Sequence, residues 1–192
     1  AKVDEALKVG GRPFAFASSP RHFERPRPFA VEHIALDLAL DFESKSIHGS
    51  ASLRIRRIDP EATAIELDAV GFAITAVTVA ATTAPGAGKE AKYTYDGARL
   101  TVQVGANIHH ATVVVIYSAT PRKGLYFLDA DEHVPTRPRQ AWTQCQEEDA
   151  RHVFPCHDKP HVKMTTEARI RVPAGFYVLS NGALAGREQV GK

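Results

Sequence analysis

Alternation of apolar and polar positions is the strongest pattern in the chain. It begins in residues 31–42, VEHIALDLALDF, where the apolar side chains at 34, 36, 38, 40 and 42 alternate with His, Ala or Asp at 33, 35, 37, 39 and 41. A period of two is typical of a strand with one buried face. A polar link and Gly49 follow, and residues 51–58, ASLRIRRI, alternate again. The two segments therefore predict a long antiparallel hairpin.

Further strands are predicted by shorter runs of the same kind. The apolar positions of residues 72–79 change parity, which indicates a β-bulge. The runs KYTY and ARLTVQV flank Asp96-Gly97, a pair that favours a type I′ hairpin turn. Residues 111–117, ATVVVIY, are apolar on both faces, which predicts a central, covered strand. The last two strands are predicted in TEARIRVP, with Ala168, Ile170 and Val172 on its apolar face, and in FYVLSNGAL.

Eight to ten strands joined by polar turns, with no long amphipathic helix, define the fold class. Single-sided strands bury their apolar faces when two sheets pack against each other. We therefore expect an all-β fold, a saddle-like β-sandwich of mostly antiparallel strands with one elaborate loop. Residues 1–30 have no lasting period and several prolines, which favours an extended N-terminal arm; residues 31–192 form the sandwich.

The elaborate loop is the stretch Ala141–Pro160, AWTQCQEEDARHVFPCHDKP. It holds the one Trp and both Cys of the chain, and its apolar residues do not alternate. Pro155 and Pro160 oppose regular structure, so we expect a shaped loop with about one helical turn within residues 146–151. Loops of this kind often carry functional sites.

Composition excludes several function classes. The net charge is +2 and acidic and basic residues are interleaved, which argues against nucleic acid as a partner. No run approaches the ~20 apolar residues of a membrane-spanning helix. The first residues carry no apolar segment typical of a secretory signal. These features favour a cytoplasmic protein with reduced thiols and no membrane partner.

The loop residues offer little chemistry of their own. His152, Cys156, His157 and His161 are zinc-ligand types, but Pro160 interrupts their spacing and no second ligand pair occurs elsewhere. The helical HExxH signature is missing from the sequence. The three acids at 147–149 are explained as a solvated face or as helix N-terminal charge. We therefore predict no metal ligand and no catalytic residue in this chain.

The loop does resemble a known family. The matching residues are Thr143-Gln144-Cys145-Gln146, Asp149-Ala150-Arg151, Phe154-Pro155-Cys156 and Asp158-Lys159-Pro160. They are similar to the motif series of the zinc aminopeptidases of the aminopeptidase N and leukotriene hydrolase family. The strand opening His33-Ile34-Ala35-Leu36-Asp37-Leu38 and the segment Gly124-Leu125-Tyr126-Phe127 extend the resemblance, which covers residues 31–185.

The resemblance implies the N-terminal domain of a zinc metallo-aminopeptidase that removes N-terminal residues from peptides. In that family the first domain is a saddle-like sandwich packed against a catalytic domain whose HExxH motif and a later Glu hold zinc. This chain contains neither, so zinc is expected in the full-length parent and none in this fragment, which should be inactive. The implied partners are the peptide substrate and the catalytic domain of the same polypeptide. The alternative is a non-catalytic scaffold or protein-interaction sandwich from a degenerate family member.

The resemblance implies a substrate-binding role for two glutamines, Gln144 and Gln146. The family residue at the position of Gln146 binds the free α-amine of the substrate, and Gln144 is expected near the substrate's first side chain. Most members have Glu where Gln146 stands, and a neutral amide forms a weaker bond to an ammonium than a carboxylate does. The alternative is that both glutamines cap the loop by bonding backbone groups.

The other matched residues are explained by structure. We expect Asp158 to accept backbone N–H groups and Arg151 to pair with Asp149 or Asp158. Phe154, Cys156 and Trp142 are expected to bury against the sandwich.

Overall fold

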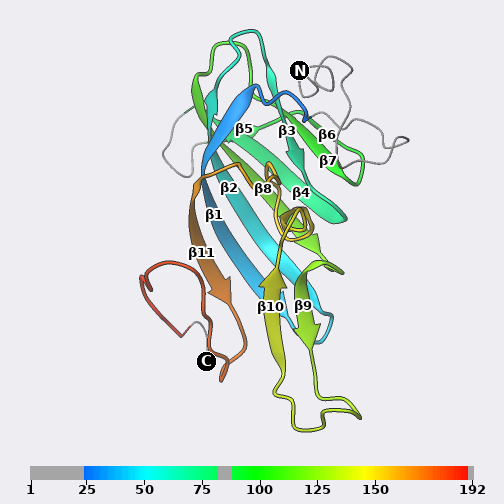
Figure 1. Cartoon of the computed structure of the whole chain (residues 1–192). Coiled ribbons are helices and arrows are strands. Elements are labelled where there is room, and N and C mark those ends of the chain that lie inside the picture. The colour runs from blue at the N-terminus through cyan, green and yellow to red at the C-terminus, as the bar shows by residue number, and fades with distance from the viewer. Residues whose placement is uncertain (1–23, 82–87, 190–192) are drawn as a thin grey trace, which may run out of the picture.

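A computed structural model describes residues 24–81 and 88–189. Within these ranges the chain forms eleven strands and one 3-10 turn (Figure 1). The hairpin predicted at the start is present, with β1 (Phe29–Asp41) antiparallel to β2 (Ser46–Arg57). A helix long and apolar enough to cross a membrane does not occur in the described part.

The larger sheet has six strands, which follow one another in the order β11 (Thr165–Arg171), β1, β2, β8 (His110–Ala119), β4 (Phe72–Ala80) and β5 (Lys89–Glu90). Its neighbours are antiparallel except for β11, which runs parallel to β1. The smaller sheet has the order β3 (Ala64–Asp68), β7 (Arg99–Gln103) and β6 (Tyr93–Tyr95). A separate two-stranded ribbon pairs β9 (Gly124–Leu128) with β10 (Gln140–Gln144).

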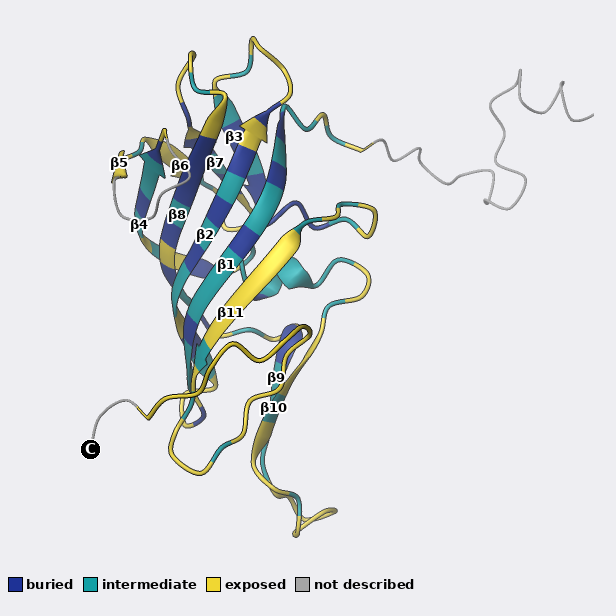
Figure 2. Ribbon diagram, turned by 90° about the vertical axis from the view of Figure 1, so that its left-hand side faces the viewer, coloured by how far each residue is buried: buried dark blue, intermediate teal, exposed yellow. Residues whose placement is uncertain are grey.

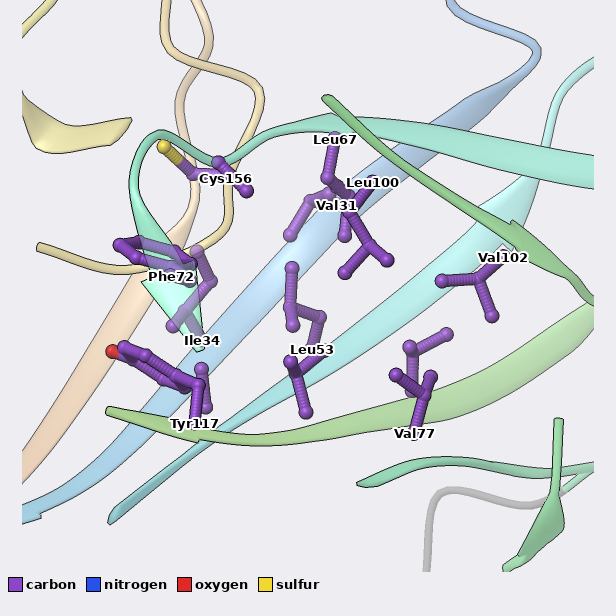
Figure 3. Close-up of a cluster of buried hydrophobic side chains, with 14 of the residues drawn as sticks. Val31, Ile34, Leu53, Leu67, Phe72, Val77, Leu100, Val102, Tyr117 and Cys156 are labelled. Atoms are coloured by element: carbon purple, nitrogen blue, oxygen red, sulfur yellow. The ribbon is translucent and has the colours of Figure 1, made fainter. Parts of the chain in front are cut away.

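The core lies between the six-stranded and the three-stranded sheet (Figure 3). Leu53 of β2 and Val77 of β4 meet Leu67 of β3 and Val102 of β7, and all four side chains are fully buried. The strands alternate because one face of each sheet packs against the other sheet, while the opposite face points away from the core. The all-β sandwich is confirmed.

Two details of the sandwich were predicted correctly and a third was not. The parity change in β4 is a register shift between Ile74 and Ala76. Strand β8 lies between β2 and β4 and is central, as expected. It is not covered on both faces, because Ile116 is 45% exposed.

The turn predicted as type I′ at Asp96-Gly97 is different. A type I′ turn needs positive φ at both central residues, and here only Gly97 has it, at +91°. The Asp96 carboxylate accepts the backbone N–H groups of Ala98 and Arg99 at 2.8 and 2.7 Å. These bonds stabilise a negative φ at Asp96, so the hairpin forms through another turn.

The C-terminal strands were predicted less well. Strand β11 forms, but Ala168 is exposed and Ile170 is only half-buried, because nothing in the described chain covers this edge (Figure 2). FYVLSNGAL forms no strand, and Tyr177 and Leu179 are 67% and 85% exposed. None of the described strands pairs with these residues.

The arm predicted for residues 1–30 falls mostly outside the described residues. Its described end lies on the sandwich, where Arg25 forms ion pairs with Glu66 and Asp68. Strand β1 begins at Phe29, before the predicted boundary.

Candidate functional site

The stretch 141–160 begins with a strand. Residues up to Gln144 belong to β10, where the sequence predicted only loop, and the helical turn is the short η1 (Ala150–His152) rather than residues 146–151. Alternation within the ribbon places Trp142 and Gln144 on one face. The opposite face packs inward, where Leu125 is buried and the Phe127 ring meets Phe42 edge-on at 5.4 Å.

The turn that carries Gln146 is anchored to the ribbon at two points. The Cys145 thiol lies 3.6 Å from the carbonyl oxygen of Gly124 and donates to it, and the Asp149 N–H donates to the Cys145 carbonyl at 3.0 Å. Gly124 has φ +77°, and a Cβ at this position would collide with the Asp149 carbonyl oxygen. The backbone on both sides of Gln146 is therefore held closely, and the bond from Gln146 to Glu147 is cis.

Arg151 pairs with Asp158, one of the two partners that the sequence predicted, and this pair ties the turn to the sandwich. Its backbone N–H and its Nε donate to Asp158 Oδ2 at 3.0 and 2.9 Å, and Nη2 donates to Glu148 at 2.6 Å. The backbone N–H of Asp158 in turn donates to Asp68 of β3 at 3.1 Å. Asp68 and Cys156 exchange two backbone hydrogen bonds, which attach the loop to the edge of the smaller sheet.

Of the three consecutive acids, Glu148 takes part in this anchoring. Glu148 accepts from Lys159 Nζ at 2.6 Å. This hydrogen bond, helped by the charges of Lys159 and Arg151, lowers the pKa of Glu148 below its ordinary value. Glu148 is therefore ionised at neutral pH and is a poor proton donor.

The candidate zinc ligands do not come together. His157 is buried and its Nε2–H donates to the Glu66 carbonyl at 3.0 Å; burial lowers its pKa to about 4. His161 is exposed and lies 3.0 Å from Glu24. Cys156 is buried and belongs to the core cluster (Figure 3), and its burial raises the pKa of its thiol. Across residues 24–81 and 88–189 no three His, Cys, Asp or Glu side chains are gathered for a metal.

Of the other predictions for the loop, those for the cysteines and Phe154 are confirmed and the one for Trp142 is wrong. Both cysteines are free thiols, and Phe154 is half-buried against the core. Trp142 is 46% exposed, not buried, because the alternation of β10 turns it away from Leu125 and Phe127.

The two candidate substrate-binding residues, Gln144 and Gln146, are both exposed. Neither side-chain amide has a hydrogen-bond partner within the described residues, so the capping role is not seen there. Sequence reasoning missed the aromatic pair next to them. Trp142 stacks on Tyr126, with ring centroids 5.0 Å apart and planes at 27°. Recognising β10 as a strand, from its cross-strand match to residues 124–128, would have revealed that pair.

The sequence and the fold of this chain can be compared with those of known proteins. The family model described as the peptidase M1 N-terminal domain matches residues 19–192. This chain belongs to that family. The resemblance inferred from the loop motifs is thereby confirmed.

Relatives and neighbours agree with this assignment. Leukotriene A-4 hydrolase of Xenopus laevis is 27% identical over 88% of this chain and 28% of its own length. Leucine aminopeptidase 2 of Sclerotinia sclerotiorum is 30% identical over 81% of this chain and 26% of its own length. An M1 zinc metallopeptidase variant of Deinococcus radiodurans, solved with a Tyr-Ser-Ala substrate, has a TM-score of 0.67 at 20% identity, over 85% of this chain and 37% of that one. The chain thus spans about a quarter of the curated relatives it matches.

Proposed function

We propose that this chain is the N-terminal domain of a zinc metallo-aminopeptidase and forms one wall of the active-site cleft. The observation that carries the proposal is the pair Gln144 and Gln146. Their amides are exposed and have no partner in the described structure, while the backbone around them is fixed by Cys145, Gly124 and Asp149. Exposed polar side chains that have no internal partner and extend from a fixed backbone are available to bind a ligand.

Gln146 is proposed to contact the α-amine of the peptide. Its side-chain carbonyl oxygen accepts a hydrogen bond from the ammonium group, whereas its NH₂ group can only donate. A carboxylate at this position would add an opposite charge to that hydrogen bond, whereas the Gln amide is neutral and only the ammonium is charged. Recognition of the amine by Gln146 is therefore weaker, and acidic side chains of the catalytic domain are expected to contribute the rest. Gln144, earlier on the ribbon, is proposed to lie near the peptide's first side chain.

Catalysis is proposed to reside outside this chain. The described residues do not fit zinc, because their potential ligands are dispersed or buried in other contacts. The peptide and the catalytic domain of the same polypeptide are the proposed partners, and a cytoplasmic location stays a prediction.

The test compares the 192-residue chain with its full-length parent. The parent should hydrolyse an aminoacyl chromogenic substrate and contain zinc, and the isolated chain should show neither turnover nor stoichiometric zinc by elemental analysis. Stoichiometric zinc in the isolated chain would contradict the placement of the metal site. A parent with zinc but no peptidase activity would contradict the proposed reaction.

A further inference from the structure

An aromatic pair is exposed on the ribbon. Trp142 of β10 stacks on Tyr126 of β9 at 5.0 Å, yet the Trp side chain is 46% exposed. Trp and Tyr offer large apolar surfaces with few rotatable bonds, which makes them efficient contact residues. The ribbon continues beyond the end of the smaller sheet (Figure 1).

The position of this pair is fixed by the rest of the ribbon. Five register pairs, from Gln140 opposite Leu128 to Gln144 opposite Gly124, join β10 to β9. Side chains alternate between the two faces of a strand. Since Leu125 and Phe127 occupy the inner face, Trp142 and Tyr126 must face outward. The stack is therefore a preformed apolar surface.

The same face carries Gln144. Two residues along a strand correspond to a separation of roughly 7 Å, a spacing that aromatic and long side chains can bridge. A ligand group that contacts the Gln144 amide can thus place an attached apolar chain on the Trp142 ring.

The surroundings fit a small ligand better than a protein surface. The stack is bordered along β10 by Gln140 and Gln144, which are polar and exposed. Interfaces between domains of one chain cover about 600–1,500 Å², far more than one aromatic pair. Ligand sites combine an apolar wall with a few polar groups, which describes Trp142, Tyr126 and Gln144.

We propose that Trp142 and Tyr126 form the apolar wall that receives the first side chain of the peptide substrate. This inference rests on the proposed function and adds a substrate class, which is peptides with a large apolar or aromatic N-terminal residue. Differences in the fit of an apolar side chain change selectivity by about 10- to 200-fold. The stack is one wall of the subsite, so the lower end of that range applies.

The experiment measures kcat/KM of the full-length parent for phenylalanyl and alanyl p-nitroanilides. Trp142→Ala should lower the Phe-to-Ala selectivity ratio about tenfold, mainly through the Phe substrate. Trp142→Phe should retain most of the ratio, because the ring is kept. Tyr93→Ala is the matched control, since Tyr93 is also an exposed aromatic, 37% exposed, but lies on β6 in another sheet. Its ratio should equal that of the wild type.

The outcomes separate the two proposals. If the wild-type parent hydrolyses both substrates and Trp142→Ala leaves the Phe-to-Ala ratio of kcat/KM unchanged, only this inference is overturned. Equal losses for both substrates, with a lowered melting temperature, also overturn it and assign the stack to a domain contact. A wild-type parent that hydrolyses neither substrate overturns the proposed function and this inference together.

Discussion

Replacing Asp158 with Ala should destabilise the domain, because it removes a buried partner that anchors the loop. Asp158 is 6% exposed and accepts two hydrogen bonds from Arg151 through one oxygen, at 3.0 and 2.9 Å. Hydrogen bonds to charged groups contribute about 1.5–3 kcal/mol each. The Arg151 side chain is 22% exposed and keeps its bond to Glu148, which reduces the loss. We therefore expect the free energy of unfolding to fall by about 3 kcal/mol.

Urea unfolding followed by circular dichroism measures this loss. With a slope of about 2 kcal/mol per molar urea, the midpoint should fall by about 1.5 M. Asp158→Asn keeps an acceptor and should lose about half as much. Glu148→Ala removes a more exposed partner of Arg151, with a side chain 39% exposed, and should cost about 0.5 kcal/mol. A loss below 1 kcal/mol in Asp158→Ala would refute the claim that this network anchors the loop.

Two further predictions concern buried polar groups of the same region. Tyr117→Phe removes the 2.6 Å hydrogen bond from the buried hydroxyl to the Val153 carbonyl. The free energy of unfolding should fall by about 1–2 kcal/mol in the same urea assay. An unchanged urea midpoint would show that this bond does not hold the loop. His157 has a pKa of about 4 in the folded chain, lowered by burial from an ordinary 6.5. As pH falls from 6.5 to 4 the unfolded chain binds a proton that the folded chain does not, so stability should fall by at most about 3 kcal/mol across that window. His157→Gln should flatten this part of the urea midpoint against pH, and an equal slope in both proteins would contradict the buried, neutral state of His157.

The sandwich could be predicted because burial imposes the alternation directly. Ile34 and Leu38 of β1 are buried where the pattern placed them. The prediction failed where the pattern does not say whether anything covers a face. Ala168 of β11 and Leu179 lie on apolar segments that remain uncovered in the described chain. Alternation in the sequence indicates which face of a strand is apolar. Whether that face is buried depends on another element packing against it.

The loop was predictable by its motifs and not by its periodicity. Arg151 and Asp158 pair as expected, because a charged residue next to buried backbone needs a specific partner. Trp142 was expected in the core, since most of a Trp surface is apolar. Its actual position depends on strand pairing with Tyr126, a long-range contact that the composition of the stretch does not encode.

The central claim is that Gln146 contacts the substrate amine, and one measurement in the full-length parent tests it most directly. The quantity is kcat/KM for a peptide with a free N-terminal amine, compared between wild type, Gln146→Ala and Gln146→Glu. A lost hydrogen bond to an ammonium group, about 1.5–3 kcal/mol, predicts a decrease of roughly 10- to 100-fold in Gln146→Ala. Gln146→Glu should retain or exceed the wild-type value, since its carboxylate adds an opposite charge to the hydrogen bond with the ammonium. An unchanged kcat/KM in Gln146→Ala would contradict the account and leave Gln146 as a residue of the loop alone.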